Sequence, residues 1–250
     1  MPPQIRRGIY AILDLDRIAP ILAETGVNER EALLAYARAA AETGAMALQL
    51  RAKSSPATSL FLSRLYGDLV KACGERLPIL MNDHPAAALP FVTSDGVGAH
   101  LGQSDASPVT ARHQLGDDAV IGLSTHTLAQ VMAAGALPVD YIGFGPVRAT
   151  HTKPGAEKPV GLGGLAAACA AASVPVVAIG GLTLGDIAAV REAGAHAMAV
   201  VTAWLGPADD PWSPDQASVA MSMLRATWLA SAPAPTPATP NEPASGEASE

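Results

Sequence analysis

The sequence predicts a single α/β domain built as a (β/α)8 barrel, and three observations support this prediction. The chain has 250 residues, a normal length for one such barrel. Eight short apolar segments alternate with longer segments of helical character. The nucleotide-binding pattern Gly-x-Gly-x-x-Gly does not follow the first apolar segment, which weakens the alternative of an open, doubly wound sheet.

The eight apolar segments are the expected strands, at 8–14, 45–50, 77–82, 96–101, 119–124, 140–145, 174–180 and 197–202. Helices are expected at 28–44, 55–74, 84–92, 107–116, 127–135, 161–173, 183–194 and 213–231. Several of these helices end in glycine, which is a common helix stop. Strands that are apolar throughout and alternate with helices imply a parallel sheet whose outer face is covered.

The composition limits the class of protein. Apolar residues make up 49% of the chain and the formal net charge is −7. A negative total argues against nucleic-acid binding through a general basic field, although one local site can still be positive. Cys73 and Cys169 lie in apolar, helix-like surroundings, so we expect reduced core thiols. No apolar run is long enough for a signal peptide or a membrane span, so we expect a soluble cytoplasmic protein without a membrane partner.

The barrel domain is expected to cover residues 1–230. Residues 231–250 contain five prolines and three glutamates but no basic or large apolar side chain. Such a segment cannot bury enough surface to offset the entropy of ordering it. We therefore expect a disordered tail. A homo-oligomer is compatible with this organisation, and the sequence leaves the oligomeric state open.

Polar residues follow the expected strands, and in such barrels the active site lies at the carboxyl ends of the strands. Gln49, Arg51 and Lys53 alternate at the end of the second strand, so they point to one side of an extended segment. The amide could hydrogen-bond a polar ring, and the two cations could bind a polyanion attached to that ring. The alternative is a solvated strand end with surface cations.

Two carboxylates follow the third and fourth strands. Asn82, Asp83 and Asp105 would reach the barrel mouth from neighbouring strands. Carboxylates with few protein partners suit Mg²⁺, which also takes water and phosphate oxygens as ligands. Alternatively, each aspartate caps the helix that follows it.

The fifth strand ends in a run of hydroxyl side chains. Ser124 either binds a ligand or caps the following helix, and Thr125 and Thr127 compete with it for the cap. His126 is expected to be a partly exposed residue at the start of that helix.

The loops after the sixth and seventh strands carry a second group of candidates. Thr150, Thr152 and Lys153 lie in a loop rich in glycine and proline, and such loops often close over a charged substrate. Gly180 and Gly181 would let the backbone approach a phosphate, or would form a plain turn. Together the strand ends suggest two phosphorylated substrates, or one substrate with a phosphate at each end.

These elements resemble the thiamine phosphate synthase family. The segments that carry the resemblance are QLRAK, ND, HLGQSD, GLSTHT, GPVRATHTK and AIGGLT, which occur in the family's order and at the same strand ends. The resemblance covers roughly residues 8–205, and its specificity comes from the combination of segments. It implies a (β/α)8 barrel that joins hydroxymethylpyrimidine diphosphate to hydroxyethylthiazole phosphate, with Mg²⁺ as cofactor and small molecules as partners.

The resemblance also implies roles for individual residues. Lys153, Arg51 and Ser124 would act in catalysis. The pyrimidine diphosphate would be held by Gln49, Arg51, Lys53, Asn82, Ser124 and Lys153. The thiazole phosphate would be contacted by Thr150, Thr152 and Gly181, by the backbone of Val201 and Thr202, and by at most the backbone of His151. Asp83 and Asp105 would bind Mg²⁺. The implied mechanism is dissociative, through a pyrimidine carbocation that the thiazole nitrogen captures, so no strong base is needed.

The sequence departs from the family pattern in four places. The segment between Asp83 and Asp105 is a few residues longer than usual, which bears on the placement of Asp105. Thr202 stands where serine is common. Arg148 is not part of the loop pattern, and the proline-rich tail lies outside the family.

Two competing functions remain. One is a thiazole tautomerase on the same barrel, in which His126 would shuttle a proton. The other is a barrel that binds thiamine-type phosphates without turnover. Only the synthase requires Mg²⁺ with a diphosphate substrate, so metal dependence separates the three.

Overall fold

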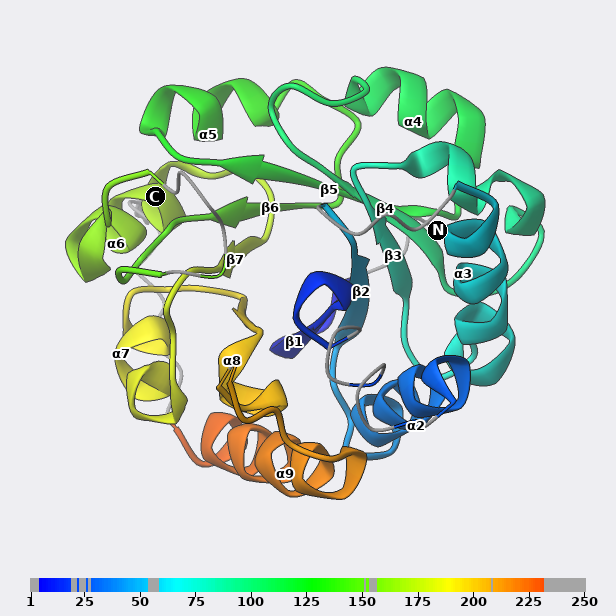
Figure 1. The fold of residues 1–250 in the computed structure, drawn as a ribbon. Coiled ribbons are helices and arrows are strands. Elements are labelled where there is room, and N and C mark those ends of the chain that lie inside the picture. Colours follow the sequence, from blue (N-terminus) through cyan, green and yellow to red (C-terminus); the bar gives the residue numbers. More distant parts are fainter. Residues whose placement is uncertain are drawn as a thin grey trace, which may run out of the picture.

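The computed structural model describes residues 5–18, 22, 26, 28–53, 59–150, 152, 157–207 and 209–231. The expected tail at 231–250 lies outside the described residues from position 232 onward. Figure 1 shows a ring of strands surrounded by helices. Within the described ranges, no helix has the length and apolar character that crossing a membrane requires.

Eight parallel strands close into a barrel in sequence order, and β1 pairs with both β2 and β8. The strands are β1 (Gly8–Asp14), β2 (Ala47–Arg51), β3 (Ile79–Asn82), β4 (Val97–Leu101), β5 (Val120–Thr125), β6 (Tyr141–Phe144), β7 (Val176–Ala178) and β8 (Ala197–Val200). Each lies within or one residue beyond a predicted segment, which confirms the predicted class. The closing pair β1–β8 rules out the open sheet.

Helices connect successive strands and cover the barrel. They are α2 (Glu29–Glu42), α3 (Ser59–Cys73), α4 (Pro108–Leu115), α5 (Leu128–Ala134), α6 (Gly161–Ala171), α7 (Ile187–Glu192), α8 (Thr202–Leu205) and α9 (Pro214–Ala230). Two short 3-10 helices accompany them, η1 (Pro85–Phe91) and η2 (Leu184–Asp186).

Three predicted elements differ from the structure. The helix expected at 84–92 is the 3-10 helix η1, which contains Pro90; proline has no N–H to continue an α-helical ladder. The helix expected at 183–194 begins with η2 before it becomes α7. The strand expected at 197–202 stops at Val200, and the chain turns into the short helix α8 at Thr202.

The core has two layers, because alternate strand residues point to opposite faces of the sheet. One layer packs between the strands and the helices. The other fills the barrel and includes Tyr10, Ile12, Ala47, Leu80, Val120, Tyr141, Val177, Ala197 and Ala199. Continuing the inward alternation toward the carboxyl ends brings Asp14, Arg51, Asn82 and Ser124 to the barrel mouth. The fold thus directs polar side chains from four strands to one end.

Candidate active site

Arg51 is anchored at the mouth by two carboxylates. Its Nη1 atom lies 2.7 Å from Oδ2 of Asp14 and 3.6 Å from Oδ2 of Asp16. The side chains of Arg51 and Asp14 are 10% and 2% exposed, so this ion pair is buried. Burial raises the pKa of Asp14, and the charge of Arg51 opposes that rise. Asp14 therefore fixes the position of Arg51, a role that sequence reasoning missed.

Lys53 contacts the first predicted metal ligand. Its Nζ lies 2.9 Å from Oδ2 of Asp83, and its backbone N–H donates to Oδ2 of Asp16. The interaction with Asp83 places Lys53 beside the predicted cation site. Arg51 and Lys53, which sequence alternation placed on one side of β2, share Asp16 as a partner.

Asp83 and Asp105 come together, as the sequence predicted. Burial first, and then the Asp83 carboxylate, raise the pKa of Asp105. Asp83 has a φ of +62°, a left-handed conformation that is uncommon for residues other than glycine, although aspartate adopts it more often than most. Among the described residues no cluster of three or more His, Cys, Asp or Glu side chains could hold a metal ion. Two hard carboxylates fit a Mg²⁺ ion that keeps water and phosphate ligands.

The helix-cap alternative for these carboxylates is wrong. Ser107 caps α4, and its side chain accepts the Thr110 N–H. Asp105 instead accepts the N–H of Gly102 at 2.6 Å, within its own turn. The residue that precedes η1 is His84, and no side-chain bond caps this helix. Neither carboxylate is therefore used to cap a helix.

Ser124 does not cap a helix either. Thr127 forms a capping box with Gln130 at the start of α5, and Thr125 donates to the carbonyl of Gly143 inside the sheet. The Oγ of Ser124 lies 2.8 Å from Nε2 of His100. Ser124 is therefore held at the barrel mouth by an interaction with β4.

A buried chain of hydrogen bonds crosses the barrel below the mouth. The Nε2 of Gln49 donates to Oη of Tyr10 at 3.0 Å, and the two hydroxyl oxygens of Tyr10 and Tyr141 are 2.8 Å apart. The Oη of Tyr141 lies 2.8 Å from Nδ1 of His100, whose other ring nitrogen meets Ser124. We call these five residues the polar relay. It connects two of the predicted pyrimidine contacts, Gln49 and Ser124.

Small residues on the inward face make room for the relay. A Cβ atom at Gly122 would collide with the ring of Tyr141, and one at Gly143 would lie 3.3 Å from the ring of His100. The two rings stack with centroids 5.6 Å apart. The glycines thus give the aromatic pair its space inside the barrel.

Gly122→Ala is therefore expected to lower the free energy of unfolding by about 1–3 kcal/mol, because the added methyl group overpacks the interior. Gly163→Ala is the matched control. No heavy atom lies near the position of its new Cβ in α6, so alanine should stabilise the helix slightly. Chemical denaturation of both variants tests the pair, and equal stabilities would contradict the packing argument.

The loop after β6 packs directly on the turn after β7. Gly180 and Gly181 have φ values of +101° and +64°, and a Cβ at either would collide with the segment from Pro146 to Ala149. Packing against this loop, together with positive φ, thus explains why both are glycines. Thr150 accepts the N–H of Thr152 through its side chain. His151 and Lys153, also predicted site residues, lie outside the described residues.

Arg148, which stood outside the family pattern, fastens this loop. Its Nη2 and Nε atoms lie 3.0 Å and 3.1 Å from Oδ1 of Asp186. Asp186 also accepts from the backbone and hydroxyl of Thr183 at the start of η2. These donors outweigh partial burial and lower the pKa of Asp186. The ion pair between Arg148 and Asp186 thus holds the loop after β6 against the loop after β7, beside the barrel mouth.

Val201 and Thr202 lie where β8 turns into α8. Val201 precedes the helix and Thr202 is its exposed first residue. The first amides of a helix have no partner within the helix, so they can donate to an anion. The structure places this turn directly after β8.

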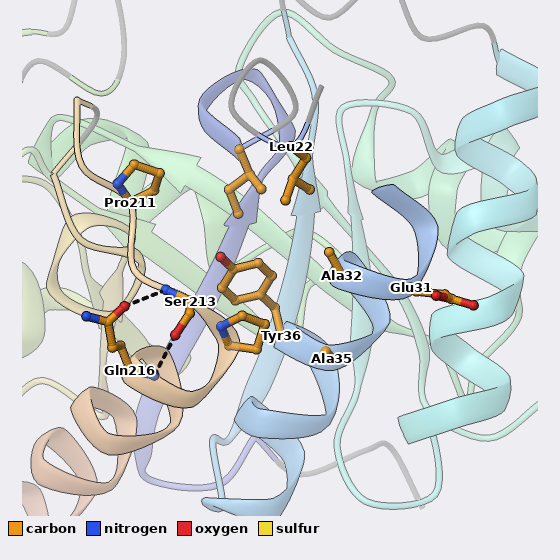
Figure 2. Close-up of a pocket in the computed structure, with 10 residues that line it drawn as sticks. Leu22, Glu31, Ala32, Ala35, Tyr36, Pro211, Ser213 and Gln216 are labelled. Carbon is orange, nitrogen blue, oxygen red and sulfur yellow. Dashed lines mark hydrogen bonds between the residues drawn. The ribbon is translucent and has the colours of Figure 1, made fainter. Parts of the chain in front are cut away.

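An apolar cavity of about 510 Å³ lies outside the barrel, between α2 and the start of α9 (Figure 2). The side chain of Tyr36 lines this cavity, and its hydroxyl group donates a hydrogen bond to the carbonyl of Trp212. The cavity is lined by Ile18, Leu22, Glu31, Ala32, Ala35, Tyr36, Pro211, Ser213, Pro214 and Gln216. None of these lining residues is a predicted site residue, and none of them is a cation that could bind a diphosphate.

The chain also matches known proteins. The family model described as thiamine monophosphate synthase matches residues 20–204. The chain belongs to the thiamine monophosphate synthase family.

Curated relatives agree with this assignment. A thiamine-phosphate synthase from Anaeromyxobacter dehalogenans (strain 2CP-C) is 43% identical over 176 residues, covering 70% of this chain and 77% of the relative. One from Pelotomaculum thermopropionicum (strain DSM 13744 / JCM 10971 / SI) is 37% identical over 205 residues, covering 82% and 91%. The structure of a thiamine phosphate pyrophosphorylase from Pyrococcus furiosus has a TM-score of 0.70 at 26% identity, covering 90% of this chain and 96% of that one. The predicted family resemblance is thus confirmed.

Sequence reasoning missed four residues of the mouth and barrel: Asp14, Tyr10, His100 and Tyr141. The alternation of side chains along each strand could have found all four, because each occupies an inward-facing strand position. Because the chain belongs to the thiamine monophosphate synthase family, the role of these buried polar groups can be tested in the reaction of that family.

Proposed function

We propose that the barrel mouth joins hydroxymethylpyrimidine diphosphate to hydroxyethylthiazole phosphate and releases thiamine phosphate and diphosphate. The observation that carries the proposal is the junction of Asp83, Asp105, Lys53 and Arg51 at one side of the mouth, in a member of this family. A paired-carboxylate site beside two cations is suited to a metal-bound diphosphate.

Asp83 and Asp105 would hold Mg²⁺. The raised pKa of Asp105 supports the fit, because burial and a neighbouring carboxylate both disfavour a second negative charge without a cation. Bound Mg²⁺ supplies positive charge that stabilises the departing diphosphate.

The proposed reaction requires little acid–base catalysis from the protein. The carbon–oxygen bond to diphosphate breaks and its electron pair leaves with the diphosphate. The resulting pyrimidine carbocation then forms a carbon–nitrogen bond with the thiazole nitrogen. Arg51, Lys53 and Lys153 stabilise the charge on the leaving group, because preorganised cations act where charge develops. Gln49, Asn82 and Ser124 hold the pyrimidine ring in line for capture.

The second substrate would bind across the mouth. Thr150, His151 and Thr152 contact its phosphate from the loop after β6, and Gly181 does so from the turn after β7. Val201 and Thr202 offer backbone amides at the start of α8. The ion pair between Arg148 and Asp186 supports this arrangement because it fixes the first loop against η2.

The decisive experiment is thiamine phosphate formation by the purified protein with both substrates and Mg²⁺. We expect turnover with the wild type and its loss on adding EDTA or in Asp83→Ala. Asp118→Ala, which replaces an exposed aspartate between α4 and β5, is the matched control and should keep full activity. A folded wild type without product would contradict the synthase, and thiazole tautomerisation and ligand binding without turnover would then be assayed.

We also propose that the protein acts in the cytoplasm. Cys73 and Cys169 are both free thiols, and burial raises the pKa of each. Cys73 is buried and Cys169 is half-buried, and unpaired thiols of this kind are typical of a reducing compartment.

A further inference from the structure

We propose that the polar relay sets the hydrogen-bond polarity of the pyrimidine subsite, holding Ser124 as a donor and Gln49 as an acceptor toward the ring. This arrangement selects an aminopyrimidine over an oxopyrimidine. The inference rests on the proposed function, because it assumes that Gln49 and Ser124 contact the ring.

The direction of the relay follows from counting protons. Burial raises the pKa values of Tyr10 and Tyr141 far above the usual range of a tyrosine, so both hydroxyls keep their single proton. Gln49 donates to Tyr10, and Tyr10 therefore passes its own proton to the oxygen of Tyr141. The hydroxyl of Tyr141 then donates to Nδ1 of His100.

This direction determines the tautomer of His100. A neutral imidazole that accepts at Nδ1 carries its proton at Nε2. His100 therefore donates to the oxygen of Ser124, and the Ser124 proton turns to the substrate. At the other end, Gln49 uses one of its two amide N–H donors on Tyr10, which orients the amide so that its carbonyl oxygen can accept from the substrate.

The opposite direction is disfavoured while Gln49 donates to Tyr10. Tyr10 would then accept from both Gln49 and Tyr141, and its own buried proton would have no acceptor in the relay. Leaving such a buried donor unpaired costs about 1–3 kcal/mol. The two ends of the relay thus have opposite polarity, one donor and one acceptor.

That pair of polarities matches an aminopyrimidine. The exocyclic amino group donates, which suits the carbonyl oxygen of Gln49, and a ring nitrogen accepts, which suits the hydroxyl of Ser124. A 4-oxopyrimidine presents a carbonyl in place of the amino group and carries a hydrogen on a ring nitrogen. It would leave polar groups of the site unpaired, a mismatch that binding sites reject strongly.

Calorimetric binding of the two pyrimidine diphosphates, amino and 4-oxo, with Mg²⁺ and without the thiazole substrate, tests the selection. We expect the wild type to favour the amino compound at least about tenfold. Tyr141→Phe breaks the relay in its middle and should reduce this ratio by about tenfold. Tyr66→Phe, which removes another buried hydroxyl that bonds Ile79 and Gly98, is the matched control and should keep the ratio.

Nitrogen NMR of His100 tests the polarity independently of turnover. We expect the Nε2–H tautomer in the free wild-type protein, with the resonance assigned by its loss in His100→Gln. We expect the same tautomer in Tyr10→Phe, where Tyr141 still donates, and a change in Tyr141→Phe. An Nδ1–H tautomer in the wild type, an unchanged ratio in folded Tyr141→Phe, or equal or absent binding of the two compounds would overturn the proposal. Failure of the proposed function would be seen separately, as absence of thiamine phosphate when both substrates are present.

Discussion

Asp105→Asn is expected to lower the Mg²⁺-dependent rate of thiamine phosphate formation by about 10²–10³-fold while stabilising the metal-free protein. The loss of rate follows because one of two carboxylates at the cation site is gone. The gain in stability follows from the environment of Asp105, where burial and the Asp83 carboxylate raise the pKa. Asparagine keeps an oxygen that can accept the Gly102 N–H but carries no charge.

The sign of the pH dependence is set by this raised pKa. The folded state holds the Asp105 proton more tightly than the unfolded state does. The free energy of unfolding therefore falls as the pH rises from the unfolded pKa through the folded pKa. The asparagine side chain of the variant does not titrate, so the stability difference between variant and wild type should be larger at neutral pH than in acid.

Thermal unfolding in EDTA at about pH 4 and about pH 7 measures the difference. Asp118→Asn is the control, because this residue is exposed. Added Mg²⁺ should stabilise the wild type more than Asp105→Asn, since a ligand that binds only the folded state stabilises it. A variant that retains the Mg²⁺-dependent rate, or that is less stable than the wild type in EDTA at neutral pH, would argue against a carboxylate pair that requires a cation.

Much of the fold could be predicted because it depends on local pattern. Continuous apolar strands between helices indicate a parallel sheet whose outer face is covered. Alternation within one strand also predicted that Gln49 and Arg51 share a face. The helix α8 was missed because four residues are too few for helical periodicity, and the apolar Val200 and Val201 resemble a continuing strand.

The relay and the anchor of Arg51 could not be predicted because their partners are distant in sequence. His100 contacts Tyr141 across 41 residues, and Tyr10 contacts Tyr141 across 131. Whether an aspartate before a helix serves as its cap depends on which side chain reaches the first turn, and Ser107 does so in place of Asp105. These outcomes depend on the closed barrel.

Arg51→Met is expected both to destabilise the protein and to abolish most activity. Asp14 is 2% exposed and relies on Arg51 at 2.7 Å, and within the described part of the chain no hydrogen-bond partner reaches its Oδ1 atom. Removing one partner of a buried ion pair leaves an uncompensated charge and costs about 3–5 kcal/mol. The rate should fall about 10²–10³-fold because a cation on the leaving diphosphate is lost.

The double variant Asp14→Asn/Arg51→Met separates the two effects. It replaces the orphaned carboxylate with a neutral amide, so we expect it to regain most of the lost stability and none of the lost rate. Asp14→Asn alone keeps Arg51 and its contact with Asp16, so its rate should fall less than that of Arg51→Met. A complete double-mutant cycle, with urea unfolding and kcat/KM measured for each member, gives the coupling energy of the pair.

The pH dependence of the cycle identifies the buried charge. Without Arg51, the pKa of Asp14 loses its main lowering influence and rises further above its ordinary value. The folded state then holds this proton more tightly, so the stability of Arg51→Met should fall as the pH rises through that range. The double variant should not show this fall. If Arg51→Met were as stable as the wild type at neutral pH, Asp14 would not be a buried charge that depends on Arg51, and the anchoring of the diphosphate site would have to come from Asp16.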